Sequence, residues 1–161
     1  MNKLIFLFLS LLSFALHALM GDHKAFVDVK AQTVVIDEPR GLSTYTGNAE
    51  VTKGSLVLSA EEILIFSVKQ TVSKIIAKGS KKKLAHYKQS QPNQARSVEA
   101  NAQTITYFIN QQLVRLEGNA HLVQGFDSFS GGILNYDIKK DKMVAGKSKN
   151  DTQRVKFKIK L

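Results

Sequence analysis

Apolar and polar residues alternate with a period of two along most of the chain after Ala25. Near the C-terminus, Val155, Phe157 and Ile159 fall on one face, and lysines occupy the positions between them. Alternation of this kind is typical of strands that bury one face. No stretch of helical length carries an apolar stripe with a period of 3.6 residues. The pattern therefore predicts an all-β protein.

Turn signals separate the alternating runs at short intervals, which predicts one antiparallel, meandering domain without an internal boundary. The segment from Gly79 to Arg96 is rich in Lys, Gln and Ser, and we expect it to contain a mobile loop. The β-branched residues between Ala60 and Ile65 favour a strand. Both faces are apolar from Ile63 to Phe66, so alternation does not assign which face of that segment points inward.

The chain contains an internal repeat with an offset of 71 residues. Thr46-Gly47-Asn48-Ala49 recurs as Glu117-Gly118-Asn119-Ala120, and at the same offset Gly54 matches Gly125 and Ser59 matches Ser130. A glycine within a long strand marks a bend or a close approach of another chain segment. We therefore expect two long strands that each curve at the glycine of the repeat.

A second pattern occurs three times: an aromatic residue, a short polar turn, an apolar segment and then a glycine. The copies start at Phe66, Tyr107 and Tyr136 and end at Gly79, Gly118 and Gly146. Each copy predicts a hairpin. Because one hairpin cannot bury its apolar face alone, stacked copies predict a twisted sandwich, a jelly roll or a short β-solenoid.

The N-terminus has the features of a secretory signal: Lys3, an uncharged apolar run from Leu4, and small residues at Ala18 and Gly21. We expect residues 1–21 to be a signal peptide cleaved after a residue between Ala18 and Gly21, and residues 22–161 to form a single domain. The alternative is a retained membrane anchor, since the apolar run is close to the shortest that spans a bilayer.

The formal net charge of +10 favours anionic partners, and export makes nucleic acid an unsuitable one. The chain has no cysteine. An exported domain without disulfides must depend on its apolar core and its backbone hydrogen bonds. Thiolate catalysis and cysteine-ligated metals are excluded as well.

The repeated motif and the residues that follow it resemble a known family. Thr46 to Gly54, followed by Leu56, Leu58, Ala60 and Ile63, resembles the OstA-like family of periplasmic lipopolysaccharide-transport proteins. In the second half, Val98-Glu99-Ala100, Ala102, Tyr107 and Leu116 to Ala120 carry the same likeness. The similarity covers about Val27 to Phe157, although this chain lacks a long polar C-terminal tail.

The resemblance implies an open, twisted antiparallel β-jellyroll with an apolar lumen in the periplasm. It implies a carrier that holds the acyl chains of lipopolysaccharide (its lipid A part) on the way from the inner to the outer membrane. It also implies head-to-tail strand pairing, either with inner- and outer-membrane components of the export machinery or in a homo-oligomer. Two of the family's lipid-contacting positions fall on Tyr107 and Ile109, and a third falls near His86.

Apolar residues of the alternating strands are the candidate lining of that lumen. A groove of this kind suits lipid, since each methylene removed from water contributes about 0.8 kcal/mol. The candidate lipid-binding residues are Val27, Val29, Ile36, Leu56, Leu58, Leu84, His86, Ile105, Tyr107, Ile109, Leu116, Leu122, Tyr136, Ile138 and Phe157. The alternative for each residue is an ordinary packed core.

An open sheet leaves backbone donors and acceptors unpaired at its edges, which permits strand addition. The candidate edges are the first strand, Ala25 to Ala31, and the last, Arg154 to Leu161. Their alternating lysines and aspartates are suited to select partner and register. The alternative is an edge that lysines merely protect from aggregation.

Other functional classes find little support in the residues. His23, His86 and His121 lack metal-ligand spacing, and no nucleophile motif or phosphate loop occurs. We therefore expect no enzyme activity, no catalytic residues, no metal and no cofactor. The basic cluster Lys81 to Lys83 predicts a solvated loop rather than a nucleic-acid site. A membrane-anchored handover subunit and an envelope scaffold that binds no lipid remain alternatives.

Overall fold

The computed structural model describes residues 26–90, 96–146 and 154–160. Every regular element in these ranges is a β-strand, and together the strands form one twelve-stranded antiparallel sheet. None of the described residues belongs to a helix that is long and apolar enough to cross a membrane. The predicted signal peptide lies outside the described residues, as do residues 91–95 of the expected loop.

The strands are numbered in chain order. Their bounds are β1 Asp28–Lys30, β2 Thr33–Asp37, β3 Leu42–Lys53, β4 Leu56–Val68, β5 Thr71–Lys78, β6 Ala85–Ser90, β7 Ser97–Ala102, β8 Thr104–Phe108, β9 Leu113–Gln124, β10 Asp127–Asp137, β11 Lys142–Gly146 and β12 Lys156–Lys158.

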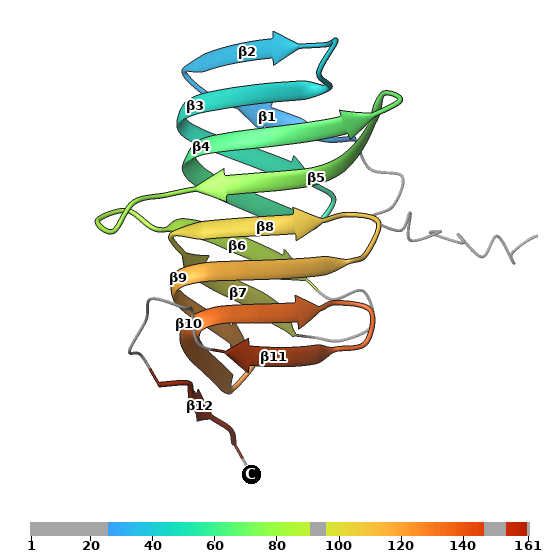
Figure 1. Ribbon diagram of the computed structural model, residues 1–161. Helices are drawn as coiled ribbons and strands as arrows, with labels where there is room; N and C mark the ends of the chain where they lie inside the picture. The colour runs from blue at the N-terminus through green and yellow to red at the C-terminus, as the bar shows by residue number, and fades with distance from the viewer. Residues whose placement is uncertain (1–25, 91–95, 147–153, 161) are drawn as a thin grey trace, which may run out of the picture.

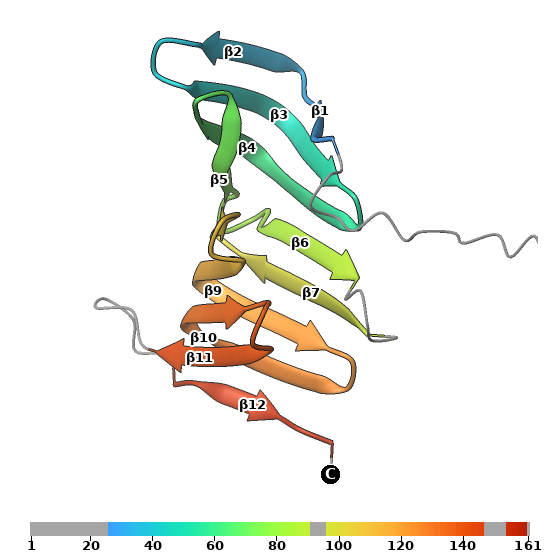
Figure 2. The ribbon, with the colours of Figure 1, turned by 90° about the vertical axis from the view of Figure 1, so that its right-hand side faces the viewer.

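The sheet folds into two facing walls because its four longest strands run through both. The front wall in Figure 1 has the order β2-β3-β4-β5-β8-β9-β10-β11. The back wall has the order β1-β3-β4-β6-β7-β9-β10-β12, with β6 and β7 filling the place that β5 and β8 hold in front. Figure 2 shows the walls from the side. The open, antiparallel β-jellyroll expected from the sequence is confirmed.

The repeated Gly-Asn pair forms a bulge in each of two long strands. In β3 the register shifts between Thr46 and Ala49 opposite β4, and in β9 an equivalent shift occurs opposite β10. Gly47 and Gly118 have φ values of 86° and 77°, and the asparagine after each also has a positive φ. The extra residue of a bulge bends a strand. Each bulge therefore lies where its strand passes from one wall to the other.

The 71-residue repeat extends well beyond the motif. Strands β1 to β6 recur as β7 to β12; β2 and β3 reappear as β8 and β9 with the same lengths. Gln32 and Gln103 are a further matched pair, outside the repeated motif. The backbone N–H of Gln103 donates to the Gly118 carbonyl oxygen at 2.8 Å, and Gln32 donates to the Gly47 carbonyl oxygen at 3.2 Å. The domain thus consists of two six-stranded units.

The bulges also explain which inward faces could be predicted from alternation. In β3 and β9 the extra residue preserves the alternation across the bend, so Val114, Leu116, Ala120 and Leu122 are all buried. In β4, which has no extra residue, the alternation slips by one between Ala60 and Ile63. Ile63 and Ile65 are buried beyond the slip. This burial assigns the inward face of the segment from Ile63 to Phe66, which the sequence pattern did not assign.

The three predicted hairpins are confirmed as β4–β5, β8–β9 and β10–β11, and all three lie in the front wall. The segment from Gly79 to Arg96, expected to contain a mobile loop, includes a strand that the sequence did not indicate. Ala85–Ser90 forms β6, which pairs with β4 on one side and β7 on the other. Its polar composition gave no strand signal, because β6 buries only Ala85 and Tyr87.

Candidate functional site

The inner faces of both walls form one apolar lining that runs the length of the sheet. Its largest fully buried side chains are Tyr87, Tyr136, Leu56, Leu58, Ile63, Ile75, Ile105, Leu116, Leu122, Leu134, Val51 and Val98. Alanines lie between them, including Ala85, Ala100 and Ala102 on adjacent strands of the back wall. The lining is continuous because inward residues pair with inward residues from strand to strand.

The candidate lining residues named from the sequence occupy three kinds of position. Leu56, Leu58, Ile105, Tyr107, Leu116, Leu122 and Tyr136 are buried between the walls. Val27, Val29, Ile109 and Ile138 are partly buried and pack against that core. Ile36 and Phe157 lie at opposite ends of the sheet, where 62% and 69% of their surfaces are exposed.

Two candidates do not take the predicted position. His86 pairs with Ser59 and Asn101, whose chain neighbours are the buried residues, so its side chain lies on the outer face. Its Nδ1 lies 2.9 Å from Asn101 Oδ1. Leu84 precedes β6 and is only partly buried, whereas Ala85 is buried. Pairing with β4 sets the inward face of β6. Because β6 contains few apolar residues, its own sequence does not show which face points inward.

Sequence reasoning missed several inward residues, of which Tyr87 is the largest. Tyr87 pairs with Leu58 and Ala100 and is 0% exposed. Its hydroxyl donates to Gln89 Oε1. Tyr136 has a similar arrangement, since its hydroxyl donates to Asp141 Oδ1 at 2.9 Å. These tyrosines therefore place an aromatic ring in the lining while the hydroxyl reaches a polar partner.

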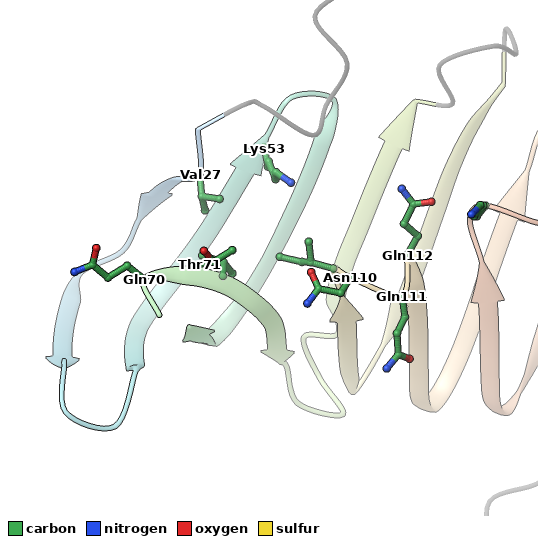
Figure 3. A pocket seen from close by; sticks show the side chains of 10 residues that line it. Val27, Lys53, Gln70, Thr71, Asn110, Gln111 and Gln112 are labelled. Carbon is green, nitrogen blue, oxygen red and sulfur yellow. The ribbon is translucent and has the colours of Figure 1, made fainter. Parts of the chain in front are cut away.

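The walls are in contact along the core, and the accessible space lies at their open margin. A hollow of about 830 Å³ is bordered by turns of the front wall (Gln70, Thr71, Gln111) and by Val27 and Lys53 from the back wall (Figure 3). Val27, Val72 and Ile109 in its lining also pack against the core. Polar residues, together with Lys53 and Lys139, form the rim. The hollow thus joins solvent to the apolar lining.

Among the residues that the structure describes, each end of the sheet presents two strands that pair on one side only. At one end these strands are β1 and β2, and at the other they are β11 and β12. The predicted edge strands β1 and β12 are therefore confirmed as edges, and β2 and β11 are edges that the sequence did not indicate. Apolar side chains are exposed at both ends, namely Val34, Val35, Ile36, Val144, Val155, Phe157 and Ile159. Such edges can accept further strands.

Charged groups lie on the outside of both walls. Between β6 and β7, Lys88 Nζ lies 2.7 Å from Glu99 Oε1. The hydrogen bond from the Lys88 ammonium, together with its charge, holds the pKa of the Glu99 carboxyl below its usual value. Among the described residues, no group of three or more His, Cys, Asp or Glu side chains could hold a metal ion. His121 Nδ1 lies 2.8 Å from Ser130 Oγ, a neutral partner.

The fold is an open, two-walled β-jellyroll with an apolar interior and with edge strands that pair on one side only in the described part of the chain. Residues 28–142 match the family described as LptA/(LptD N-terminal domain) LPS transport protein. The chain therefore belongs to this family of lipopolysaccharide transport proteins.

Individual relatives agree with the family match. The chain is 29% identical to the lipopolysaccharide export system protein LptH of Pseudomonas aeruginosa, over 81% of this chain and 74% of LptH. It is 28% identical to LptA of Escherichia coli K12, over 80% and 68% of the two chains. LptA of Haemophilus influenzae is 26% identical, over 94% and 90%.

A solved structure also resembles the fold. The crystal structure of LptH from Pseudomonas aeruginosa, described as the periplasmic component of a lipopolysaccharide transport device, superposes with a TM-score of 0.79 at 26% identity. The match covers 87% of this chain and 99% of the LptH chain. The arrangement of strands is thus shared over almost the whole of the solved LptH chain.

Proposed function

We propose that the chain carries lipopolysaccharide across the periplasm by holding the acyl chains of lipid A between its two walls. The observation that carries this proposal is the continuous apolar lining from one open edge of the sheet to the other. A small pocket suits one ligand tail, whereas a lining shared by all strands can hold several tails and let them move along it. The relatives named above are lipopolysaccharide export proteins, which agrees with this cargo.

Lipid entry requires the walls to separate, because Ile105, Leu116 and Leu122 are 0% exposed. The acyl chains enter from the open margin, where Val27, Val72 and Ile109 connect the hollow with the core. Each acyl methylene that replaces a wall-to-wall contact leaves the total burial nearly unchanged. Binding is then moderate in strength, which suits a carrier that must release its cargo.

The polar part of the lipid stays outside the walls. Lys53 and Lys139 on the rim of the hollow place ammonium groups where the sugar phosphates would lie. Long-range attraction to anions is also favoured by the formal charge of +10. The proposed carrier works without catalysis, cofactor or metal, and does not bind nucleic acid.

Assembly is the second part of the proposal. The edge strands at the two ends pair head to tail with export components of the inner and outer membranes or with further copies of the chain. Such pairing extends the apolar lining from one molecule into the next. Residues 1–21 serve as the signal peptide, cleaved after a residue between Ala18 and Gly21, which leaves 22–161 as the working domain. N-terminal sequencing of the exported protein distinguishes this carrier from a membrane-anchored handover subunit.

A photo-crosslinking pair of neighbouring aromatic residues tests lipid binding. Tyr107 faces the other wall, and Phe108, the next residue, lies on the outer face. Replacing each in turn with benzoylphenylalanine and irradiating cells is expected to give lipopolysaccharide adducts at position 107 and few at 108. Equal labelling, or labelling at neither position in a variant with normal thermal unfolding, would contradict the proposed lumen and favour a scaffold without lipid.

A second pair, in the opposite wall, tests the position at which sequence and structure differ. Tyr87 lies in the lining and His86 outside it. The same photo-reactive residue is expected to label lipopolysaccharide from position 87 but not from position 86. Adducts from 86 alone would mean that lipid lies on the outer face of β6, against the proposal.

A further inference from the structure

Both walls end in turns along the open margin of the sheet (Figure 2). The back wall contributes the β3–β4 and β9–β10 turns, and the front wall contributes the β4–β5 and β10–β11 turns. The strands cross from wall to wall at the opposite margin, where the bulges lie. Nothing in the backbone therefore fixes the distance between the walls at the open margin, and side-chain contacts decide it.

Asp141 of the β10–β11 turn joins the two walls at this margin. Gln124, the last residue of β9, belongs to the back wall, and its Nε2 donates to Asp141 Oδ1 at 2.6 Å. Tyr136 of β10 belongs to the front wall, and its hydroxyl donates to the same oxygen at 2.9 Å. One carboxylate oxygen thus accepts a hydrogen bond from each wall. Hydrogen bonds to an ionised acceptor are stronger than those between neutral groups.

The β10–β11 turn holds Asp141 in position. The Asp137 carboxylate accepts a hydrogen bond from the Lys140 backbone N–H at 2.9 Å, inside the turn. The Ile138 N–H donates to the Gln112 carbonyl oxygen at 2.9 Å, which ties the turn to the β8–β9 turn. Asp141 itself has a φ of 49°, a conformation that aspartate adopts more readily than most residues. The turn therefore positions this carboxylate independently of the back wall.

The N-terminal unit has different groups at the corresponding positions. Gln124 corresponds to Lys53, 71 residues earlier, and Tyr136 corresponds to Ile65, which has no hydroxyl. The β4–β5 turn, which corresponds to the β10–β11 turn, contains Gln70 and no carboxylate. Lys53 and Gln70 both border the hollow described above, and their side chains point away from each other (Figure 3). The margin is therefore open in this unit.

We propose that Gln124, Asp141 and Tyr136 form a latch that holds the margin of the C-terminal unit closed, so that acyl chains enter and leave the lumen sideways through the hollow alone. This inference rests on the lipid carriage proposed above and names the residues that restrict its route. Lys139, which borders the hollow, belongs to the same turn as Asp141. The latch therefore stands beside the hollow, between the open and the closed part of the margin.

The latch acts on an equilibrium between a closed and an open margin. Its hydrogen bond between Gln124 and Asp141 is exposed to solvent, so water competes for both groups. Losing a hydrogen bond to a charged group of this kind is expected to raise the ratio of open to closed molecules about tenfold. Tyr136, which is 1% exposed, gains access to solvent when the margin opens. The buried ring thus favours the closed state together with the latch.

Spin labels measure the width of the margin directly, because the chain has no cysteine of its own. Labels on F126C and K140C lie in the β9–β10 and β10–β11 turns and report the gap in the C-terminal unit. Labels on S55C and K69C lie in the β3–β4 and β4–β5 turns and report the gap in the N-terminal unit. Double electron–electron resonance on the purified protein without lipid gives both distance distributions.

An exchange of donor and acceptor tests the latch at almost constant side-chain volume. Q124E replaces the donating amide with a carboxylate that faces Asp141, and it is expected to shift the F126C–K140C distribution toward longer distances. The double variant Q124E/D141N is expected to restore the short distances. Its new amide donates to the carboxylate at position 124, and the amide oxygen still accepts from the Tyr136 hydroxyl.

Two controls accompany the exchange. Q111E makes the same chemical change in the exposed β8–β9 turn and is expected to leave the F126C–K140C distances unchanged. The S55C–K69C distances are expected to be the same in all of these variants, because the latch lies in the other unit. Thermal unfolding of each variant shows that the sheet remains folded.

The rate of lipid release tests the role of the latch in the lipid route. Each protein is loaded with fluorescent lipopolysaccharide, and its release is followed after addition of excess unlabelled lipopolysaccharide. Q124E is expected to release the lipid about tenfold faster, in proportion to its larger open population. Q124E/D141N is expected to return to the rate of the unmodified chain.

The outcomes separate this inference from the carrier proposal. Unchanged F126C–K140C distances in Q124E, or no recovery in the double variant, would overturn the latch. Changed distances with an unchanged release rate would overturn its role in the lipid route. Absence of lipopolysaccharide binding by the unmodified chain would overturn the carrier proposal, whereas the distances measured without lipid would still decide whether the latch exists.

Discussion

Replacing Ile105 with alanine is expected to lower the free energy of unfolding by about 2–5 kcal/mol. Ile105 is 0% exposed, and β8, its strand, pairs with β5 and β9 in the middle of the front wall. The substitution removes three methylene-sized groups from a packed site whose neighbours are held in strands on both sides, so the cavity cannot collapse fully. Urea denaturation followed by circular dichroism at low protein concentration measures the change.

Ile36→Ala is the matched control for this experiment. Ile36 is the same residue type in the same kind of position on an alternating strand, but 62% of its surface is exposed at the end of the sheet. Its truncation in a monomeric sample is expected to change stability by no more than about 0.5 kcal/mol. Similar losses for both variants would mean that Ile36 is buried in the monomer or that Ile105 is not.

Replacing Gly118 with alanine is expected to cost about 1–3 kcal/mol, the usual cost of holding a residue in a strained backbone conformation. Gly118 has a φ of 77°, and a Cβ atom there would lie 2.6 Å from Gln103 Oε1. The side chain of Gln103 must therefore move, while its backbone N–H still donates to the Gly118 carbonyl oxygen. Thermal and urea unfolding both report this loss.

Two further variants separate the causes of the Gly118 effect. Adding Gln103→Ala to Gly118→Ala removes the contacts with Oε1 and Cδ but leaves the contact with the Cβ of residue 103, at 3.1 Å, and the positive φ, so only part of the stability is expected to return. Gly146→Ala is the control, because no atom of the described residues, apart from its chain neighbours, lies within 4 Å of the position its Cβ would take. It is expected to be neutral within about 0.5 kcal/mol. A neutral Gly118→Ala variant would show that the bulge does not require glycine at this position.

Much of the architecture could be predicted because alternation and turn residues act locally. A strand that buries one face must alternate, so the hairpins beginning at Phe66, Tyr107 and Tyr136 could be recognised without knowledge of their neighbours. The repeated Gly-Asn pair could be recognised as a bend for the same reason, because glycine adopts a positive φ without the steric cost that a side chain imposes. The inward residues of β8 and β9 followed directly from alternation.

His86 and Ile36 show where this reasoning ends. His86 was placed inward by resemblance, but the pairing of β6 with β4 turns Tyr87 inward instead. Ile36 alternates like a core residue, yet its strand has no partner beyond it in the described chain and so remains exposed. In both cases the outcome depends on a strand that lies elsewhere in the sequence.

The amino-acid sequence by itself determined that this protein is made of strands, where they turn, where two of them bend, and that it repeats after 71 residues. These properties arise from interactions between residues close together in the chain. Only the tertiary structure decided that the repeats stack into two facing walls, which side of β4 and β6 faces inward, and which strands lie at the two ends of the sheet. Those features depend on the register between strands that are distant in the sequence. Register is set by strand pairing, and the local sequence pattern does not specify which strands pair.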